Sequence, residues 1–415
     1  MNIKLHQSTC KLQSTIKITG SKSETNRMLL LQALYPSIEL LNTSASDDSE
    51  VMLKALQFQD NDRAQLIDVH HAGTAMRFLT AFCAIQIGKE FIVTGSDRMQ
   101  QRPIKILVDA LLQLGAKIEY LKTDGYPPLK ITGTQLTTSE VTINANVSSQ
   151  YLSALLLIAP KLKNGLILTL DGTITSLPYL KMTLALLNQI GIESSFEANV
   201  IKVKPCQVIT NFALITIESD WSSASYWYSI AALSSSGTEI ILFNYKKNSL
   251  QGDAALAQIY KHFGVNTVFN DNESITISKT GAHSNNPLSI DLNNCPDIAQ
   301  TIAVTCFGLK IGCHLTGLET LKIKETDRLA ALYNELGKLG ATITVTNDSL
   351  HLQPSDKINN NVTIATYQDH RMAMAFAPLA LKTNIIIENA EVVSKSYPTF
   401  WNDLKSVGFE IDEVN

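Results

Sequence analysis

Lysine and arginine side chains stand at the start of several predicted helices, where a positive charge is least favourable. The stretch GSKSETNRMLLLQAL (20–34) begins with a capping box, Ser21 followed by Glu24, and continues as an apolar helix body. It also carries Lys22 and Arg27. Because the first turn of a helix has a partial positive charge, these cations either are solvated or require a negative partner. With backbone N–H groups and a serine hydroxyl, they could bind a phosphate or a carboxylate.

Two further predicted helix starts carry hydrogen-bond donors but fewer charged side chains than the first. In HAGTAMRFLTAF, Gly73 opens a predicted helix and Arg77 follows in its first turn. A glycine lets a ligand approach the backbone closely, so an anion site and an ordinary helix start are both compatible with this stretch. In SSQYLSALLLIAP, Ser148, Ser149 and Gln150 precede an apolar helix. They could bind phosphate oxygens or sugar-like hydroxyls, or could simply cap the helix.

Carboxylates accompany the cations in the second half of the chain. KIKETDRLAALYNEL places Glu325 between Lys324 and Arg328. A surface ion pair is one interpretation, and a carboxylate that moves protons beside a bound anion is the other. In PDIAQTIAV, Asp297 follows a proline at a helix start, where an acidic residue can serve as a cap. YQDHRMAMAF adds Arg371 at another helix start, after an acidic candidate N-cap.

The overall charge makes a local anion site more plausible than a broad basic surface. The chain has 415 residues, with 34 basic and 38 acidic side chains and a net charge of −4. A nucleic-acid or anionic-membrane partner would need a basic excess on one face, so neither is expected. The recurring cationic helix starts instead predict a focused pocket for a small substrate with two or three acidic groups.

The sequence also predicts the location of the protein and the redox state of its cysteines. The first residues lack a cationic region followed by an apolar run, and no apolar stretch reaches the roughly 20 residues that span a bilayer. We therefore expect a cytoplasmic protein. The six cysteines are scattered, without a C-x-x-C pair or a neighbouring histidine at ligand spacing, and predict reduced, mostly buried thiols and no metal site.

A repeated helix–glycine–strand pattern must position these residues. Its glycines recur at intervals of about 70 residues, and they are Gly115, Gly191, Gly264, Gly340 and Gly408. A glycine after the last helical turn is the expected C′ residue. A second strand follows most copies after a turn, which predicts a mixed α/β unit of strand, helix, strand, helix and strand pair. Five clear copies and a degenerate sixth near the N-terminus indicate two domains of three units each.

Taken in order, the stretches resemble the 5-enolpyruvylshikimate-3-phosphate synthase family over nearly the whole chain. The stretches are GSKSETNR, AGTAMR, RPI, SSQYLSALL, SDWSSASY, QGD, PDIAQTIAV, KETDRL, DHRMAMAF and SKSYPTFW. The resemblance implies a two-domain inside-out α/β barrel with three βαβαββ units per domain, helices inside and sheets outside. We expect one domain at 1–12 plus 219–415, the other at 13–218, and a double-stranded hinge near 12–19 and 215–222.

The resemblance also implies a reaction and its substrates. The enolpyruvyl group of phosphoenolpyruvate would move to the 5-hydroxyl of shikimate 3-phosphate, with release of phosphate and without a metal or organic cofactor. The residues implied for shikimate 3-phosphate are Lys22, Ser23, Arg27, Ser148, Ser149, Gln150 and Ser176. Those implied for phosphoenolpyruvate are Gly73, Arg102, Arg328, Arg371 and Lys395, with Lys22 and Gln150 reaching both ligands.

The implied catalytic residues are Asp297, Glu325 and Lys22, and Lys324 is implied to contact substrate. Asp297 would be the base for the 5-hydroxyl, and Glu325 with Lys22 would move protons at the methylene carbon. We expect a monomer whose two halves close on shikimate 3-phosphate. The chain departs from the common family pattern at His71, Phe78, Leu177 and Thr320.

Two alternative functions stay open at this point. The related enolpyruvyl transferases that act on UDP-N-acetylglucosamine use a loop cysteine as proton donor, and no cysteine of this chain stands in a matching loop. The other alternative is a non-catalytic anion-binding protein of the same fold. Asp297 and Glu325 argue against it, because a protein that only binds an anion gains nothing from acids beside that anion.

Overall fold

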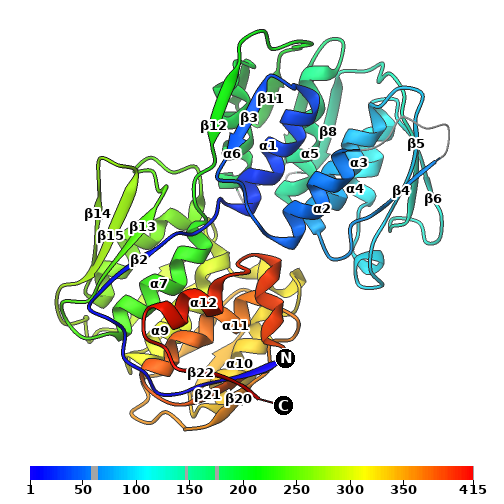
Figure 1. Ribbon diagram of the computed structural model, residues 1–415. Coiled ribbons are helices and arrows are strands. Elements are labelled where there is room, and N and C mark those ends of the chain that lie inside the picture. The colour runs from blue at the N-terminus through cyan, green and yellow to red at the C-terminus, as the bar shows by residue number, and fades with distance from the viewer. Residues whose placement is uncertain (58–63, 145–147, 173–176, 415) are drawn as a thin grey trace. The chain divides into compact units, whose positions relative to one another are not determined.

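The computed structural model describes residues 1–57, 64–144, 148–172 and 177–414 (Figure 1). The chain forms two compact units, which we call the terminal unit (Met1–Thr19 and Glu218–Asn415) and the inserted unit (Gly20–Ile217). This division differs from the expected boundary at residue 12. The difference arises because strand β2 (Gln13–Ile16) pairs in parallel with β13 (Glu239–Phe243) and so belongs to the terminal unit.

In its described residues, the terminal unit has three four-stranded sheets. Their strand orders are β2-β13-β15-β14, β16-β17-β19-β18 and β20-β21-β1-β22. The other strands are β1 (Asn2–Leu5), β14 (Val265–Phe269), β15 (Ser274–Lys279), β16 (Leu288–Asp291), β17 (Cys313–Thr316), β18 (Ile343–Val345), β19 (Leu350–Leu352), β20 (Val362–Ile364), β21 (Ile385–Ile387) and β22 (Ile411–Val414). In each sheet one parallel pair is followed by two antiparallel pairs, so the three sheets repeat one plan.

The inserted unit repeats the plan twice and adds a shorter sheet. Its strand orders are β4-β5-β7-β6, β10-β11-β9-β8 and β12-β3. The strands are β3 (Ile38–Leu41), β4 (Gln65–Asp68), β5 (Glu90–Thr94), β6 (Lys117–Tyr120), β7 (Leu129–Thr132), β8 (Glu140–Asn144), β9 (Leu166–Asp171), β10 (Ser194–Glu197), β11 (Val200–Val203) and β12 (Ala213–Thr216). The two-stranded sheet is the predicted degenerate copy, because it contains the first strand after the N-terminal helix.

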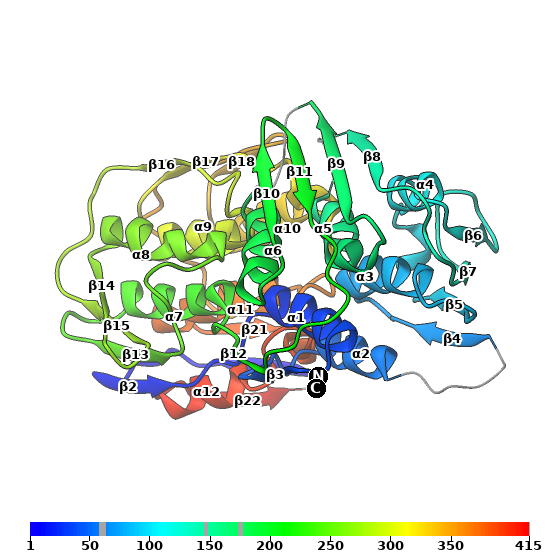
Figure 2. The same cartoon turned by 90° about the horizontal axis from the view of Figure 1, so that it is seen from above.

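Helices occupy the interior of each unit. They are α1 (Lys22–Leu34), α2 (Asp47–Leu56), α3 (Gly73–Ala84), α4 (Lys105–Gln113), α5 (Ser149–Ile158), α6 (Leu177–Gln189), α7 (Trp221–Leu233), α8 (Leu256–Ile259), α9 (Ala299–Gly308), α10 (Arg328–Lys338), α11 (His370–Phe376) and α12 (Phe400–Ser406). Every residue of α7 and α9 is buried, as expected of core helices. Figure 2 shows these two helices between β13–β15 and β16–β17. The predicted fold class, with helices inside and sheets outside, is confirmed.

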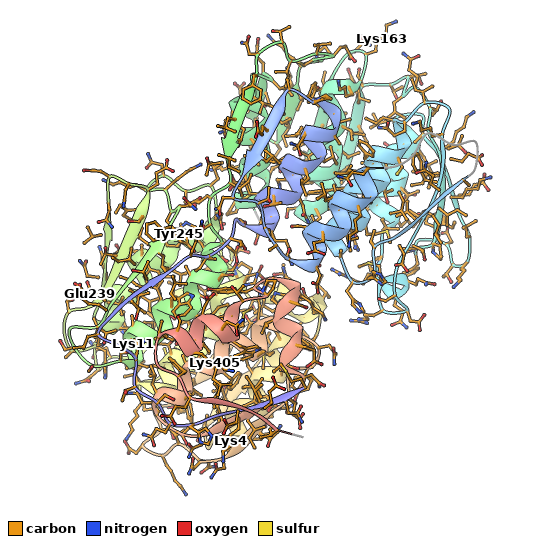
Figure 3. All side chains as sticks on the ribbon, viewed as in Figure 1. Lys4, Lys11, Lys163, Glu239, Tyr245 and Lys405 are labelled. Atoms are coloured by element: carbon orange, nitrogen blue, oxygen red, sulfur yellow. The ribbon has the colours of Figure 1, made fainter. Side chains whose placement is uncertain are left out.

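Side chains fill the interior of each unit and charged ends line its surface. Figure 3 shows Tyr245, which is 1% exposed, within the terminal unit, and the exposed Lys163 at the outer edge of the inserted unit. Within the described ranges, no helix is both long and apolar enough to cross a membrane.

The repeated glycines have the left-handed backbone that the sequence predicts. The φ angles are 100° at Gly115, 87° at Gly191, 72° at Gly264, 100° at Gly340 and 108° at Gly408. Each glycine precedes a strand that pairs antiparallel with its neighbour, namely β6, β10, β14, β18 or β22. A side chain at this φ would be strained, which explains why the same residue type returns at each helix end.

Candidate functional site

Arg27 of the inserted unit is buried among neutral partners. It is 2% exposed. Nε donates to Thr183 Oγ1 at 2.8 Å, Nη2 to Ser153 Oγ at 3.0 Å, and Nη1 to the Ser23 carbonyl at 2.7 Å. Burial lowers the pKa of Arg27 to about 10, although Tyr179 and the negative charge of Glu24 act in the opposite direction. The guanidinium is withdrawn from solvent and hydrogen-bonded to hydroxyl and carbonyl oxygens, and an anionic ligand beside it would stabilise its charge further.

Lys22 begins α1 and has an acidic partner that the sequence interpretation missed. Its Nζ lies 3.4 Å from Asp48 Oδ2, and the two side chains are 21% and 14% exposed. Asp48 lies in the acidic first turn of α2. Acidic residues at such a position are ordinarily explained by their interaction with the helix dipole. The predicted capping box is wrong in one respect. Ser21 occupies the N-cap position, but its side chain makes no capping hydrogen bond.

The N-terminus of α3 brings Gly73 and Arg102 together. A Cβ atom on Gly73 would lie 2.6 Å from Arg102 Nη1, so the guanidinium packs against the glycine backbone. Gln150 reaches the same helix start, because its Nε2 donates to Thr74 Oγ1 at 3.1 Å. The structure therefore brings three of the predicted site residues to the start of α3. They are Gly73, Arg102 and Gln150, which lie far apart in the chain.

Arg77 holds the Arg102 segment in place instead of facing a ligand. It is 3% exposed, and it donates to the Gly73 carbonyl at 3.2 Å and to the Pro103 carbonyl at 3.0 Å. Burial lowers the pKa of Arg77 to about 10, and the neighbouring charge of Arg102 adds to the effect. This arginine thus ties the start of α3 to the residue after Arg102.

The start of α5 contains a genuine cap. Ser148 is the N-cap residue, and its hydroxyl accepts from the Gln150 backbone N–H at 3.4 Å. Ser148 is exposed, whereas Ser149 is buried. Ser176 lies outside the described residues. The capping interpretation therefore holds for Ser148, and its exposed hydroxyl remains a candidate contact for a ligand.

In the terminal unit, Arg328 joins three carboxylates. This first residue of α10 has a side chain that is 1% exposed. Nε lies 2.7 Å from Asp369 Oδ2, Nη1 2.8 Å from Asp297 Oδ1, and Nη2 2.9 Å from Glu325 Oε2. Burial opposes the charge, but the three acids outweigh it and raise the pKa of Arg328 above its usual range. The pair of Glu325 and Arg328 is therefore not an exposed surface ion pair.

Asp297 lies within a group of cations. It lies 2.8 Å from Arg328 Nη1, 3.2 Å from Arg371 Nη2 and 3.4 Å from Lys324 Nζ, and its side chain is 10% exposed. Burial by itself raises the pKa of this carboxyl, but the three cations outweigh burial and hold the pKa well below its usual range. Asp297 is therefore a carboxylate at neutral pH, positioned to accept a proton or to orient the surrounding cations.

Arg371 and Lys395 meet at the start of α11. The carboxylate of Asp369 caps this helix by accepting from the Arg371 backbone N–H at 2.8 Å. Lys395 Nζ donates to the backbone carbonyl of Gln368 at 2.7 Å. The predicted N-cap at Asp369 is confirmed, and the same residue also binds Arg328. One acid therefore serves the helix and the ion-pair network together.

Asp253 was not among the predicted site residues, although it belongs to the quoted QGD stretch. It is 5% exposed and accepts a hydrogen bond from the Ser222 hydroxyl. Burial raises the pKa of the Asp253 carboxyl to about 7, and the negative charge of Asp297 adds to the rise. A lone acid after a glycine carries no pattern that separates it from a turn residue, so sequence reasoning had no signal for it.

Replacing Asp253 with asparagine is expected to stabilise the terminal unit above neutral pH. The carboxyl pKa is about 7 when folded and about 3.9 when unfolded, so the folded state binds the extra proton and stability is lost as pH rises from 4 to 7. The amide keeps an acceptor for Ser222. We expect the melting temperature to rise by roughly 3 °C at pH 8 and to stay unchanged near pH 4. Tryptophan fluorescence checks this, because all three tryptophans lie in the terminal unit.

The exposed Asp291 provides the matched control for this prediction. Asp291→Asn should leave the pH dependence unchanged. An Asp253→Asn protein whose stability followed the wild-type curve across this range would show that Asp253 is already a carboxylate at neutral pH.

Comparisons with known proteins agree with each other. The family model for EPSP synthase (3-phosphoshikimate 1-carboxyvinyltransferase) matches residues 47–404. A 3-phosphoshikimate 1-carboxyvinyltransferase of Bacteroides fragilis strain YCH46 is 45% identical over 408 residues, covering 97% of both chains. One from Shewanella pealeana is 37% identical over 425 residues, covering 96% of this chain and 97% of its own.

Solved structures share the fold. An EPSP synthase from Acinetobacter baumannii superposes with a TM-score of 0.80 at 22% identity, covering 99% of this chain and 100% of its own. The enolpyruvyl transferase NikO from Streptomyces tendae gives a TM-score of 0.75 at 14% identity, covering 100% and 98%. With the repeated βαβαββ sheets and the family match over most of its length, the chain belongs to the EPSP synthase (3-phosphoshikimate 1-carboxyvinyltransferase) family.

Proposed function

We propose that this protein transfers the enolpyruvyl group of phosphoenolpyruvate to the 5-hydroxyl of shikimate 3-phosphate and releases phosphate. The observation that carries the proposal is Asp297, a buried carboxylate kept ionised by Arg328, Arg371 and Lys324. A protein that only bound an anion would gain from the three cations and would lose from the acid between them. A reaction that needs both anion binding and a proton acceptor uses all four groups.

Shikimate 3-phosphate is assigned to residues of the inserted unit. They are Lys22, Ser23, Arg27, Ser148, Ser149, Gln150 and Ser176. Arg27 supports the assignment most directly, because it is buried and its hydrogen-bond partners are neutral hydroxyls and carbonyls. A phosphate beside this buried guanidinium would stabilise its charge through a charge-assisted hydrogen bond.

Phosphoenolpyruvate is assigned to Gly73, Arg102, Arg328, Arg371 and Lys395, with Lys22 and Gln150. Gly73 supports the assignment because it leaves the start of α3 open to the Arg102 guanidinium. Arg328 has five N–H donors, of which four point to Asp369, Asp297 and Glu325. It therefore acts chiefly by orienting these carboxylates, while one Nη1 hydrogen is left for a ligand.

Proton transfer is assigned to the acids beside these cations. Asp297 takes the proton of the 5-hydroxyl, and Glu325 with Lys22 carries protons to and from the methylene carbon. A carboxylate with a low pKa is a weak base, but the negative charges of phosphoenolpyruvate partly neutralise the surrounding cations. Ligand binding would therefore raise the pKa of Asp297 toward neutrality, when the base is needed.

A coupled phosphate assay tests the proposed function. Purified protein should release phosphate from phosphoenolpyruvate when shikimate 3-phosphate is present and should release none when the acceptor is omitted. Phosphate release with UDP-N-acetylglucosamine, and none with shikimate 3-phosphate, would assign the chain the other enolpyruvyl transfer. Anion binding without phosphate release from either acceptor would identify a non-catalytic protein.

Replacing Glu325 with glutamine is expected to lower kcat about 100-fold while leaving shikimate 3-phosphate binding unchanged. Glutamine keeps an oxygen for the 2.9 Å contact with Arg328 Nη2 but cannot carry a proton at neutral pH. Steady-state kinetics and ligand titration separate the two effects. Glu319→Gln is the matched control, because Glu319 is exposed in the same segment. Turnover equal to wild type in Glu325→Gln would remove this acid from the mechanism.

Replacing Gly73 with alanine is expected to raise the KM for phosphoenolpyruvate about tenfold, a change of ~1.4 kcal/mol. The new methyl group meets the end of the Arg102 side chain, which must move, whereas the backbone φ suits any residue. Thermal stability should therefore change little. Kinetics with each substrate varied in turn checks the prediction, and Gly281→Ala is the control because nothing lies within 4 Å of its Cβ position. An unchanged KM for phosphoenolpyruvate would place Arg102 outside its binding site.

A further inference from the structure

Helix α10 holds the segment 365–371 at two points. At its first residue, Arg328 Nε lies 2.7 Å from Asp369 Oδ2. Seven residues later, Glu335 Oε2 accepts from the Ala365 backbone N–H at 3.0 Å, and Oε1 accepts from the Tyr367 hydroxyl at 2.7 Å. Residues seven apart lie on one face of a helix. A single rigid element therefore fixes both ends of this short segment.

The backbone between these two points is strained. Tyr367 has φ 53° and Gln368 has φ 58°, so two consecutive non-glycine residues adopt the left-handed conformation. Such residues keep this conformation only where the surrounding structure holds them. The turn is closed by the Asp369 backbone N–H, which donates to the Thr366 carbonyl at 2.8 Å, and the contacts of Glu335 and Arg328 bracket the two strained residues.

The strained turn determines where two proposed ligand-binding cations lie. It points the Gln368 carbonyl at Lys395 Nζ, which donates to it at 2.7 Å. It also delivers Asp369 as the N-cap of α11, with its carboxylate 2.8 Å from the Arg371 backbone N–H. If the turn relaxed, the acceptor of Lys395 and the start of the Arg371 helix would move with it.

The hydrogen bond between Glu335 and Tyr367 joins a buried carboxylate to a partly exposed side chain. The Glu335 side chain is fully buried, and Lys338 Nζ lies 2.7 Å from its Oε2. Tyr367, in contrast, is 37% exposed. Its hydroxyl nevertheless reaches the buried Glu335 Oε1. A buried carboxylate whose oxygens are satisfied by a backbone N–H, a hydroxyl and an ammonium group forms a rigid anchor.

We propose that Glu335, acting through Tyr367, is a positioning residue for phosphoenolpyruvate: it holds the strained turn that places Lys395 and Arg371. The proposal rests on the proposed function in assigning these two cations to that substrate. It adds two residues that touch neither ligand but set the geometry of groups that do.

The test compares Tyr367→Phe with Tyr333→Phe. Tyr333 lies on the same helix and is 50% exposed, so its variant removes a hydroxyl without disturbing the turn. In Tyr367→Phe we expect a three- to tenfold rise in the KM for phosphoenolpyruvate and a KM for shikimate 3-phosphate within twofold of wild type. Glu335→Gln, which keeps an oxygen for the tyrosine, should show a smaller rise if it folds. Tyr333→Phe should match wild type.

Amide hydrogen exchange of peptides covering 363–372 supplies a readout that does not require activity. Exchange should be faster in Tyr367→Phe and unchanged in Tyr333→Phe. Equal rises in both KM values, or a wild-type KM for phosphoenolpyruvate, would overturn the positioning role, as would wild-type exchange. A wild-type protein without enolpyruvyl transfer would overturn the proposed function instead, and the exchange result would still decide whether Glu335 and Tyr367 hold the turn.

Discussion

Replacing Arg328 with methionine should destabilise the terminal unit by about 3–5 kcal/mol. The change leaves the side chains of Asp369, fully buried, and Asp297, 10% exposed, without the cation that joins them. A buried carboxylate that loses its partner keeps its desolvation penalty and loses the compensating attraction. Urea unfolding at pH 7, followed by tryptophan fluorescence, measures the effect in the terminal unit, where all three tryptophans lie.

Two further variants provide a comparison and a control for that measurement. Arg328→Lys keeps the charge but cannot reach three carboxylates with one ammonium group, so we expect an intermediate loss. Arg98→Met removes an exposed arginine of the inserted unit and should leave the transition unchanged. A loss below about 1 kcal/mol in Arg328→Met would mean that the three acids are stabilised by other groups or are protonated.

Replacing Asp297 with asparagine should lower kcat by 100-fold or more, the range expected for a lost general base. The amide fills the same space and keeps an oxygen near Arg328, but it cannot accept the proton of the 5-hydroxyl. Shikimate 3-phosphate binding should persist, because its proposed residues lie in the inserted unit. Single-turnover kinetics with saturating substrates, together with ligand titration, check both parts.

The pH dependence of kcat and kcat/KM provides a second test of the role of Asp297. Because the pKa of Asp297 lies well below its usual range in the free protein, kcat/KM should show no loss from this group as pH falls from 7 to 5. In the substrate complex the cations are partly neutralised, so kcat should fall at a higher pH than kcat/KM does. Asp291→Asn, at an exposed acid, should keep wild-type profiles. Near-wild-type turnover in Asp297→Asn would assign the base elsewhere.

The cationic helix starts show which features of the site could be predicted from the sequence. Residue types and spacing identified Arg27 and Arg328 as unusual, but left solvated cations or a surface ion pair as alternatives to an anion-binding site. The structure places both among the most buried side chains, 2% and 1% exposed. Two partners of Arg27 lie 156 and 126 residues away, and those of Arg328 lie up to 41 residues away. No local pattern contains such distant contacts.

By itself the sequence determined the repeated α/β unit, because helix periodicity, C′ glycines and paired strands are local properties that reappear in each copy. It also determined which residue types could bind anions, and the family resemblance named their reaction. Only the tertiary structure decided which cation meets which acid. Asp48, Asp253 and Glu335 acquire their roles through burial and through partners on other elements. Charge and hydrogen bonding act across space, so the fold must exist before these interactions do.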